Sequence, residues 1–308
     1  MPSRLFMSSG DMIADRRFDF ARDLQLRGEL VAAEDLFVQA TSLAPGFATA
    51  WFTLGEVREQ LGDRAGAIVA FGHAQSNDAG DRNGAGLRLM RLGAAELTGM
   101  QPTYVRALFD QYAPKFEKAL VEGLGYCAPA LLLQAVLASR AAAGKSAFFK
   151  DAIDLGCGTG LAAHAFAART ESIVGIDLSQ RMVELARATG LYTQVEVAEI
   201  VEWLALRPEA SVDLILAADV MVYVHDLASL LREAARVLAP GGVLAFTAET
   251  HPGEGVVLVE GLRYAHGVDH LRSSVASAGL LLDRLELASS RTETGVPVPG
   301  LVAVAVKA

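Results

Sequence analysis

The chain has 308 residues, of which 52% are hydrophobic and 20% are charged, and its net charge is −9 at neutral pH. This length and composition allow two domains with a sizeable core and exclude a globally disordered chain. The negative charge, without a long basic run, argues against nucleic-acid binding. The two cysteines form neither a disulfide framework nor a metal-ligand cluster, so we expect no metal site.

The N-terminal residues and the longest apolar run indicate where in the cell the protein is expected. The first residues lack the apolar core of a secretory signal. The longest helix-like apolar run, Ala128 to Ser139, is too short to cross a bilayer. With so few cysteines, we expect a cytoplasmic protein that does not associate with membranes.

An internal repeat stands in the first hundred residues. The pattern Ala-x3-Phe-x2-Ala occupies residues 33–40 and returns 34 positions later at residues 67–74, where Trp51, Leu54 and Gly55 precede it. This resembles the tetratricopeptide repeat (TPR), whose period is 34 residues. One good and one partial copy are fewer than such an array needs, so we expect a helix at 86–97 to cap it.

The TPR resemblance implies an all-helical domain over residues 1–99, closed by the linker Thr98–Pro102. Its surface would face a protein partner or a substrate, or it would serve only to stabilise a catalytic domain or a homodimer. The sequence leaves these alternatives open, because a fold alone does not give a function. Helices are expected next over residues 104–112, from Pro114, and over 129–143.

A glycine-rich turn follows the first predicted strand. The run Asp154-Leu-Gly-Cys-Gly-Thr-Gly160 joins a buried strand at 148–155 to an alanine-rich helix at 161–169. A second strand ends in Asp177, 21 positions after Gly156. In an α/β sheet an acid at that place can accept both hydroxyls of a ribose.

The spacing of the glycines distinguishes two classes of cofactor. A dinucleotide site needs a small residue where Leu161 stands. The turn, followed by Gly175-Ile-Asp-Leu-Ser179, instead resembles motif I of the class I S-adenosylmethionine (SAM)-dependent methyltransferases. The resemblance covers residues 100–308, with a helical lid at 100–147 and a Rossmann-like core at 148–308. It implies SAM as cofactor and a seven-stranded, mostly parallel sheet with an antiparallel last strand, which the runs at 280–287 and 300–306 would complete.

The resemblance also assigns the residues that bind the cofactor. Asp177 would hold the ribose, and Glu199, after a strand at 192–197, would accept the adenine amino group, with Ile200 beside the ring. The alternative for Glu199 is a solvated acid in the first turn of a helix at 200–206. The full predicted set is Asp154, Gly156, Gly158, Gly160, Asp177, Leu178, Glu199, Ile200 and Asp219.

Two residues are candidates for the chemistry. His225 follows the expected central strand at 212–220, where the family often keeps a polar residue that orients or deprotonates the acceptor. The alternative is that His225 and Asp226 cap the next helix. Tyr112 lies in Phe109–Ala113, which resembles a segment that folds over the cofactor in small-molecule methyltransferases. Its alternative is an aromatic contact between lid helices.

The predicted activity is methyl transfer from SAM to an oxygen or nitrogen of a small organic acceptor, without a metal. Residues 219–222 are Asp-Val-Met-Val, which disfavours the methylases of DNA adenine or protein glutamine. Two alternatives remain open: a protein methyltransferase whose repeats recruit the substrate protein, and a non-catalytic SAM-binding interaction protein.

Overall fold

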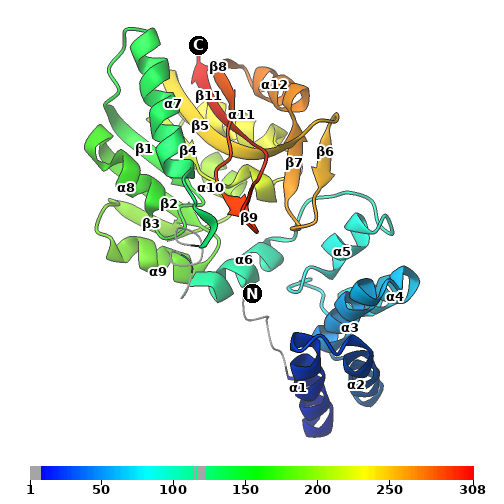
Figure 1. Cartoon of the computed structure of the whole chain (residues 1–308). Helices are drawn as coiled ribbons and strands as arrows, with labels where there is room; N and C mark the ends of the chain where they lie inside the picture. The colour runs from blue at the N-terminus through cyan, green and yellow to red at the C-terminus, as the bar shows by residue number, and fades with distance from the viewer. Residues whose placement is uncertain (1–7, 114–115, 117–122) are drawn as a thin grey trace. The chain divides into compact units, whose positions relative to one another are not determined.

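A computed structural model describes residues 8–113, 116 and 123–308. The chain divides into two compact units (Figure 1). The first comprises the residues up to Gln111 together with Glu260–Leu262, and the second comprises Tyr112–Val259 and Arg263–Ala308. The division falls inside helix α6 (Pro102–Tyr112), beyond the linker expected at Thr98–Pro102.

Paired helices build the first unit. Helix α1 packs on α2, α2 on α3, α3 on α4 and α4 on α5. The repeated Ala and Phe residues are all buried, and they lie at matching places on α2 and α4. A side chain on Gly55 would lie 2.6 Å from the Phe71 ring, so glycine lets α3 approach α4 closely. These helices are α1 (Met12–Leu26), α2 (Leu30–Leu43), α3 (Ala48–Leu61), α4 (Arg64–Ser76) and α5 (Ala85–Arg91).

The helix expected at 86–97 ends earlier. Leu92 follows the last helical residue, and Gly93 has φ of +65°, a left-handed conformation that stops a helix. Part of the predicted lid, the helix from Pro114, lies outside the described residues except for Phe116 and the residues from Gly123 onward. The next helix, α7 (Ala128–Ala142), agrees with its prediction.

A mixed β-sheet forms the centre of the second unit. Its main path has the order β3-β2-β1-β4-β5-β11-β8, parallel from β3 to β5, with β11 antiparallel to both neighbours. The strands of this path are β1 (Phe149–Leu155), β2 (Thr170–Asp177), β3 (Gln194–Val197), β4 (Val212–Ala217), β5 (Leu238–His251), β8 (Leu280–Leu287) and β11 (Gly300–Lys307).

Within the described residues, the sheet has nine strands rather than the predicted seven. The extra strands are β6 (Val256–Leu258) and β7 (Tyr264–Gly267), which form a hairpin, and β7 pairs with the end of β5. The sequence showed no strand there because each is short and no alternation of polar and apolar residues marks it. A separate small hairpin, β9 (Thr292–Glu293) with β10 (Val296–Pro297), lies between β8 and β11.

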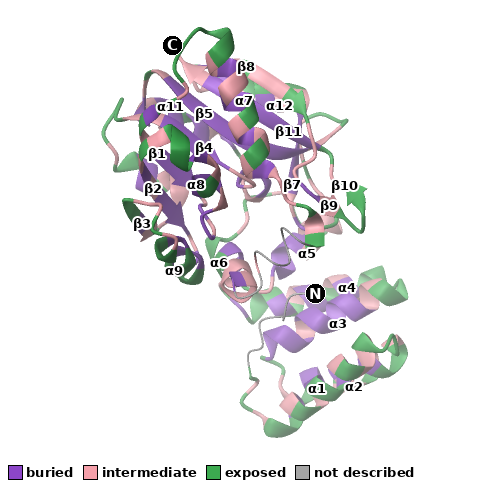
Figure 2. Ribbon diagram, turned by 60° about the vertical axis from the view of Figure 1, so that its left-hand side comes forward, coloured by how far each residue is buried: buried purple, intermediate pink, exposed green. Residues whose placement is uncertain are grey.

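Helices cover the sheet on both faces, so its strands are buried on both sides (Figure 2). Ile153 and Leu155 pack in the cluster that contains residues of α10, α11 and α12, whereas Ala152 packs in the cluster with residues of α7 and α8. The covering helices besides α7 are α8 (Leu161–Phe166) with the 3₁₀ segment η3 (Ala167–Arg169), α9 (Gln180–Ala188), α10 (Ile200–Ala205), α11 (Ala228–Val237) and α12 (Val268–Ser277).

Strand β4 ends at Ala217, three residues before the predicted end at Val220. Asp219 has φ of +61°, which takes the chain out of the extended conformation, and the 3₁₀ segment η4 (Met221–Tyr223) follows. A search of the described helices for one long and apolar enough to cross a bilayer finds none.

Candidate active site

The glycine-rich turn lies at the carboxyl end of β1, between β2 and β4. Gly156, Gly158 and Gly160 have φ values of +62°, +52° and +99°, a region that side-chain-bearing residues rarely adopt. A Cβ on Gly156 would lie 2.7 Å from the Val220 side chain. The three predicted glycines therefore form a tight turn, and the Gly158 and Gly160 N–H groups donate hydrogen bonds within the protein, to Asp177 and to the Cys157 carbonyl oxygen.

Asp177 ties this turn to the end of β2. Its Oδ2 accepts a hydrogen bond of 3.0 Å from the Gly158 N–H, and its Oδ1 accepts one of 2.8 Å from the Ser179 N–H. Ser179 caps α9, as predicted, by accepting from Met182. Asp177 is 7% exposed, and a carboxylate oxygen can accept more than one hydrogen bond. Leu178 lies between Asp177 and the cap.

Asp154 is the most unusual carboxyl group of the turn. It is buried, its Oδ2 accepts a hydrogen bond of 2.6 Å from Tyr192, and its Oδ1 has no hydrogen-bond partner among the described residues. Burial raises the pKa of Asp154 to about 7, against the effect of the Tyr192 hydrogen bond and with a further increase from the Asp177 charge. A buried carboxyl oxygen that has no partner among the described residues, next to the glycine turn, fits a cationic cofactor such as SAM.

Tyr192 packs against the glycine turn, a contact that the sequence analysis did not predict. A side chain on Gly175 would meet the Tyr192 ring at 2.8 Å, and one on Gly160 would meet it at 3.3 Å. The ring thus packs beneath both glycines while its hydroxyl holds Asp154. The only sequence signal is the presence of small residues at both places.

The end of β3 carries Glu199 and Ile200. Glu199 Oε2 accepts a hydrogen bond of 2.8 Å from the Glu202 N–H and so caps α10. This agrees with the alternative of a first-turn acid, and it leaves Oε1 for other contacts. Ile200, half-buried, is the first residue of α10.

The two predicted catalytic residues occupy different segments. His225 follows η4, is half-buried and makes an edge contact with the Tyr264 ring, with centroids 5.4 Å apart. Asp226 is exposed and accepts a hydrogen bond of 2.9 Å from the Ala228 N–H at the start of α11. No hydrogen bond between described residues joins His225 to Asp226, so Asp226 alone acts as a cap. Tyr112 is the last residue of α6 and is half-buried.

A polar cluster that the sequence did not predict lies at the ends of β4 and β5. Asp219 Oδ2 pairs with Arg263 at 2.7 Å, and Arg263 also donates to Tyr223 and to Glu249. Tyr126 precedes α7 and lies within electrostatic reach of Asp219 and Asp154. Burial raises its pKa well above the usual value, and the charges of Asp219 and Asp154 raise it further.

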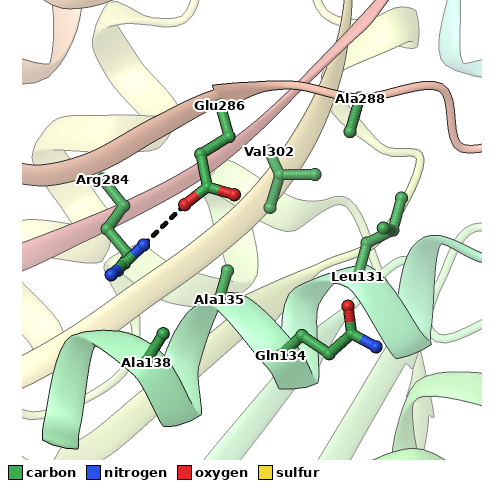
Figure 3. Close-up of a pocket in the computed structure, with 8 residues that line it drawn as sticks. All are labelled: Leu131, Gln134, Ala135, Ala138, Arg284, Glu286, Ala288 and Val302. Carbon is green, nitrogen blue, oxygen red and sulfur yellow. Dashed lines mark hydrogen bonds and ion pairs between the residues drawn. The ribbon is translucent and has the colours of Figure 1, made fainter.

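A cavity of about 180 Å³ lies elsewhere, between α7 and strands β8 and β11 (Figure 3). Its lining is about equally polar and apolar, with an ion pair of 2.6 Å between Arg284 and Glu286 on its wall. None of its lining residues belongs to the glycine turn or to the strand ends described above, so we assign it no part in the site. They are Leu131, Gln134, Ala135, Ala138, Arg284, Glu286, Ala288 and Val302.

Within the described part of the chain, no group of three or more His, Cys, Asp or Glu side chains is placed to hold a metal ion. His266, although buried near His225 and His270, has its Nε2 3.1 Å from the Met221 carbonyl oxygen. Burial lowers its pKa to about 4, so it is a neutral packing residue at physiological pH.

Comparison with known proteins agrees with this geometry. The family model described as a methyltransferase domain matches residues 153–246, which run from β1 into β5. This part of the chain is therefore similar to a methyltransferase domain. The match includes the glycine turn, Asp177, Glu199 and Asp219, and SAM is the cofactor that the domain implies.

Curated relatives of this methyltransferase domain include two enzymes named ubiquinone biosynthesis O-methyltransferase. The one from Bordetella pertussis is 29% identical over 49% of this chain and 64% of its own length. The one from Alkalilimnicola ehrlichii is 34% identical over 36% of this chain and 47% of its own length. The chain therefore matches less than two thirds of either relative. Among solved structures, the cyclase SpnF is 19% identical with a TM-score of 0.53, covering 69% of this chain and 99% of SpnF, a likeness of fold alone.

Proposed function

We propose that the chain transfers a methyl group from SAM to an oxygen or nitrogen of a small organic acceptor, without a metal ion. The observation that carries the proposal is the glycine turn with Asp154 and Asp177 inside the matched methyltransferase domain. The two curated relatives are named as O-methyltransferases, which favours oxygen over nitrogen as the acceptor atom.

Each predicted residue has a role in this proposal. When bound, SAM supplies an electrophilic methyl group on a sulfonium. Asp177 holds the ribose hydroxyls, Glu199 and the Ile200 backbone hold the adenine, and the three glycines with Leu178 shape the cradle. Asp154 provides negative charge near the cationic end, and Asp219, whose charge is paired with Arg263, lies on the β4 side of it. Proximity and alignment supply several kcal/mol of the rate acceleration.

A base is needed only where the acceptor loses a proton. His225 is the proposed base because it lies just beyond the carboxyl end of β4, the edge that carries the glycine turn. Tyr112, at the end of α6, is the second candidate.

The first unit supports an alternative. Its paired helices carry the 34-residue repeat at buried, equivalent places, which favours a TPR-like domain over residues 1–99 ahead of a methyltransferase domain at 100–308. Such a domain could recruit a substrate protein or take part in a homodimer. The cyclase SpnF has the same fold, so the fold by itself leaves a non-catalytic or different activity open. We place the protein in the cytoplasm on the composition argument.

The experiment is a survey with SAM that carries a tritiated methyl group, tested against metabolite fractions and whole lysate proteins separated by size. Label in a small molecule is the expected result, and label in protein alone would support the recruitment alternative. SAM binding by calorimetry without any labelled product would support the non-catalytic one. Binding of NAD more tightly than SAM would overturn the cofactor assignment.

A further inference from the structure

Five side chains at the ends of β4 and β5 form one connected group, which we call the arginine cluster: Asp219, Tyr223, Glu249, Arg263 and Arg291. The Arg263 guanidinium donates to Asp219 at 2.7 Å, to Tyr223 at 2.7 Å and to Glu249 at 2.9 Å. Arg291 also donates to Glu249, at 2.7 Å. The four charged side chains are between 4% and 13% exposed. Buried charges in such number are costly unless paired, and each here has an opposite partner.

The cluster depends on the strands that the sequence did not predict. Arg263 immediately precedes β7, in the β6–β7 hairpin that extends the sheet beyond β5. Asp219 is held from the other side, because its N–H donates to the Thr247 hydroxyl at 2.8 Å and its φ is +61°. A non-glycine residue with positive φ is strained, and such strain is often found at functional sites. Contacts on both sides keep Asp219 in this conformation.

One oxygen of Asp219 is uncommitted. Oδ2 bonds Arg263, whereas Oδ1 accepts no hydrogen bond from the described residues. Both guanidiniums are already paired with carboxylates, Arg263 with Asp219 and Glu249 and Arg291 with Glu249 and Glu293. The cluster thus offers a ligand a hydrogen-bond acceptor but no free positive charge.

The cluster lies beside the proposed cofactor site and apart from its adenosine end. In the sheet order, β1 separates β2 and β3, with Asp177 and Glu199 at their ends, from β4 and β5. Tyr126 is near both sides, since the charges of Asp154 and Asp219 both raise its pKa. A molecule next to the cationic end of the cofactor would therefore meet Asp219 on the β4–β5 side.

We propose that the arginine cluster is the acceptor-binding wall, that Asp219 Oδ1 accepts a hydrogen bond from an O–H or N–H of the acceptor, and that the acceptor is uncharged. Arg263 is a positioning residue, which fixes Asp219 and Tyr223 through one rigid guanidinium. The proposal rests on the proposed methyl transfer and names its substrate class. An anionic acceptor is disfavoured because both guanidiniums of the cluster are already paired with carboxylates. A cationic acceptor is disfavoured because those carboxylates are already neutralised by the guanidiniums.

The first test uses the wild-type protein. A small-molecule cell extract is separated by ion exchange into uncharged, anionic and cationic fractions, and each receives SAM with a tritiated methyl group. We expect labelled product from the uncharged fraction. Label confined to the anionic or the cationic fraction would overturn the proposal while leaving the methyltransferase function intact. If S-adenosylhomocysteine binds by calorimetry but no fraction is labelled, the proposed catalysis fails, and the acceptor assignment fails with it.

The second test examines Arg263. In Arg263→Lys the charge stays, but one ammonium cannot hold Asp219, Glu249 and Tyr223 together. The amount of uncharged fraction needed for half-maximal labelling should rise about fivefold or more, whereas the affinity for S-adenosylhomocysteine should stay within about twofold. Arg284→Lys, which alters an ion pair beside the α7 cavity, is the matched control and should change neither value.

Tyr223→Phe provides a second variant in case Arg263→Lys does not fold. It removes only the hydroxyl that accepts from Arg263 and keeps the ring, over which Arg263 lies 5.1 Å from the centroid. It should raise the half-saturating amount in the same direction. A normal half-saturating amount in a folded, S-adenosylhomocysteine-binding Tyr223→Phe or Arg263→Lys variant would refute the positioning role.

Discussion

Replacing Tyr192 by phenylalanine tests whether ionised Asp154 takes part in binding SAM. The Tyr192 hydroxyl donates the only hydrogen bond that the described residues give to the Asp154 carboxyl group, and the buried Oδ1 is already without a partner. The substitution leaves the ring under Gly160 and Gly175 in place. Loss of a charge-assisted hydrogen bond of about 1.4 kcal/mol or more raises the Asp154 pKa by about one unit.

The size of the effect on SAM binding follows from the pKa. In the wild type Asp154 has a pKa of about 7, so roughly half of it is ionised at pH 7. In the variant, with a pKa of about 8, about a tenth is ionised, so the dissociation constant of SAM, a cation, should be about fivefold higher at pH 7. At pH 9 the two proteins should bind almost equally, because both are then ionised.

Calorimetry of SAM binding between pH 6 and pH 9 measures this shift. Tyr264→Phe, which removes a tyrosine hydroxyl from β7 instead, is the control and should keep the wild-type profile. Wild-type binding that does not change across this range, or a Tyr192→Phe profile equal to it, would refute the role of ionised Asp154.

The stability of the folded protein should change with pH in the opposite direction to SAM binding. The pKa of Asp154 is about 7 in the folded protein and 3.8 in the unfolded chain. The contribution of this carboxyl group to the free energy of unfolding is therefore fully present below pH 3.8 and is lost as the pH rises through 7.

Three further changes test the other assignments. Asp177→Ala should weaken SAM binding by about 1.5–3 kcal/mol, since the ribose loses a charged acceptor; an unchanged dissociation constant in the folded variant would remove Asp177 from the site. His225→Ala should lower the rate of single-turnover methyl transfer by about a hundredfold and leave the SAM affinity unchanged. A near-normal rate with a lowered melting temperature would make Tyr112 the candidate base instead of His225. Residues 100–308 alone should bind SAM like the full chain, and a folded fragment that does not bind would mean that the first 99 residues complete the cofactor site.

Local features of the sequence were sufficient to predict the glycine turn and the residues that flank it in the second unit. A strand followed by closely spaced glycines and a helix is a short-range pattern, so the turn at Gly156–Gly160 and the acid at Asp177 could be predicted, and Ser179 could be recognised as a cap. The resemblance to the class I methyltransferases implied a mostly parallel sheet with an antiparallel last strand, and the described sheet has this arrangement with two further short strands. The repeat in the first unit was visible for the same reason, because its period is regular.

Only the tertiary structure determined which polar side chains meet at the carboxyl edge. Tyr192 and Asp154 are 38 positions apart in the sequence, and Arg263 and Asp219 are 44 apart. Such pairs leave no periodic pattern, since they depend on where loops and the short β6–β7 hairpin carry each side chain. The short-range rules also placed the end of β4 too late, because the positive φ of Asp219 is imposed by its contacts with Thr247 and Arg263. The sequence thus determined the cofactor cradle, whereas long-range packing determined the charges that surround the proposed acceptor site.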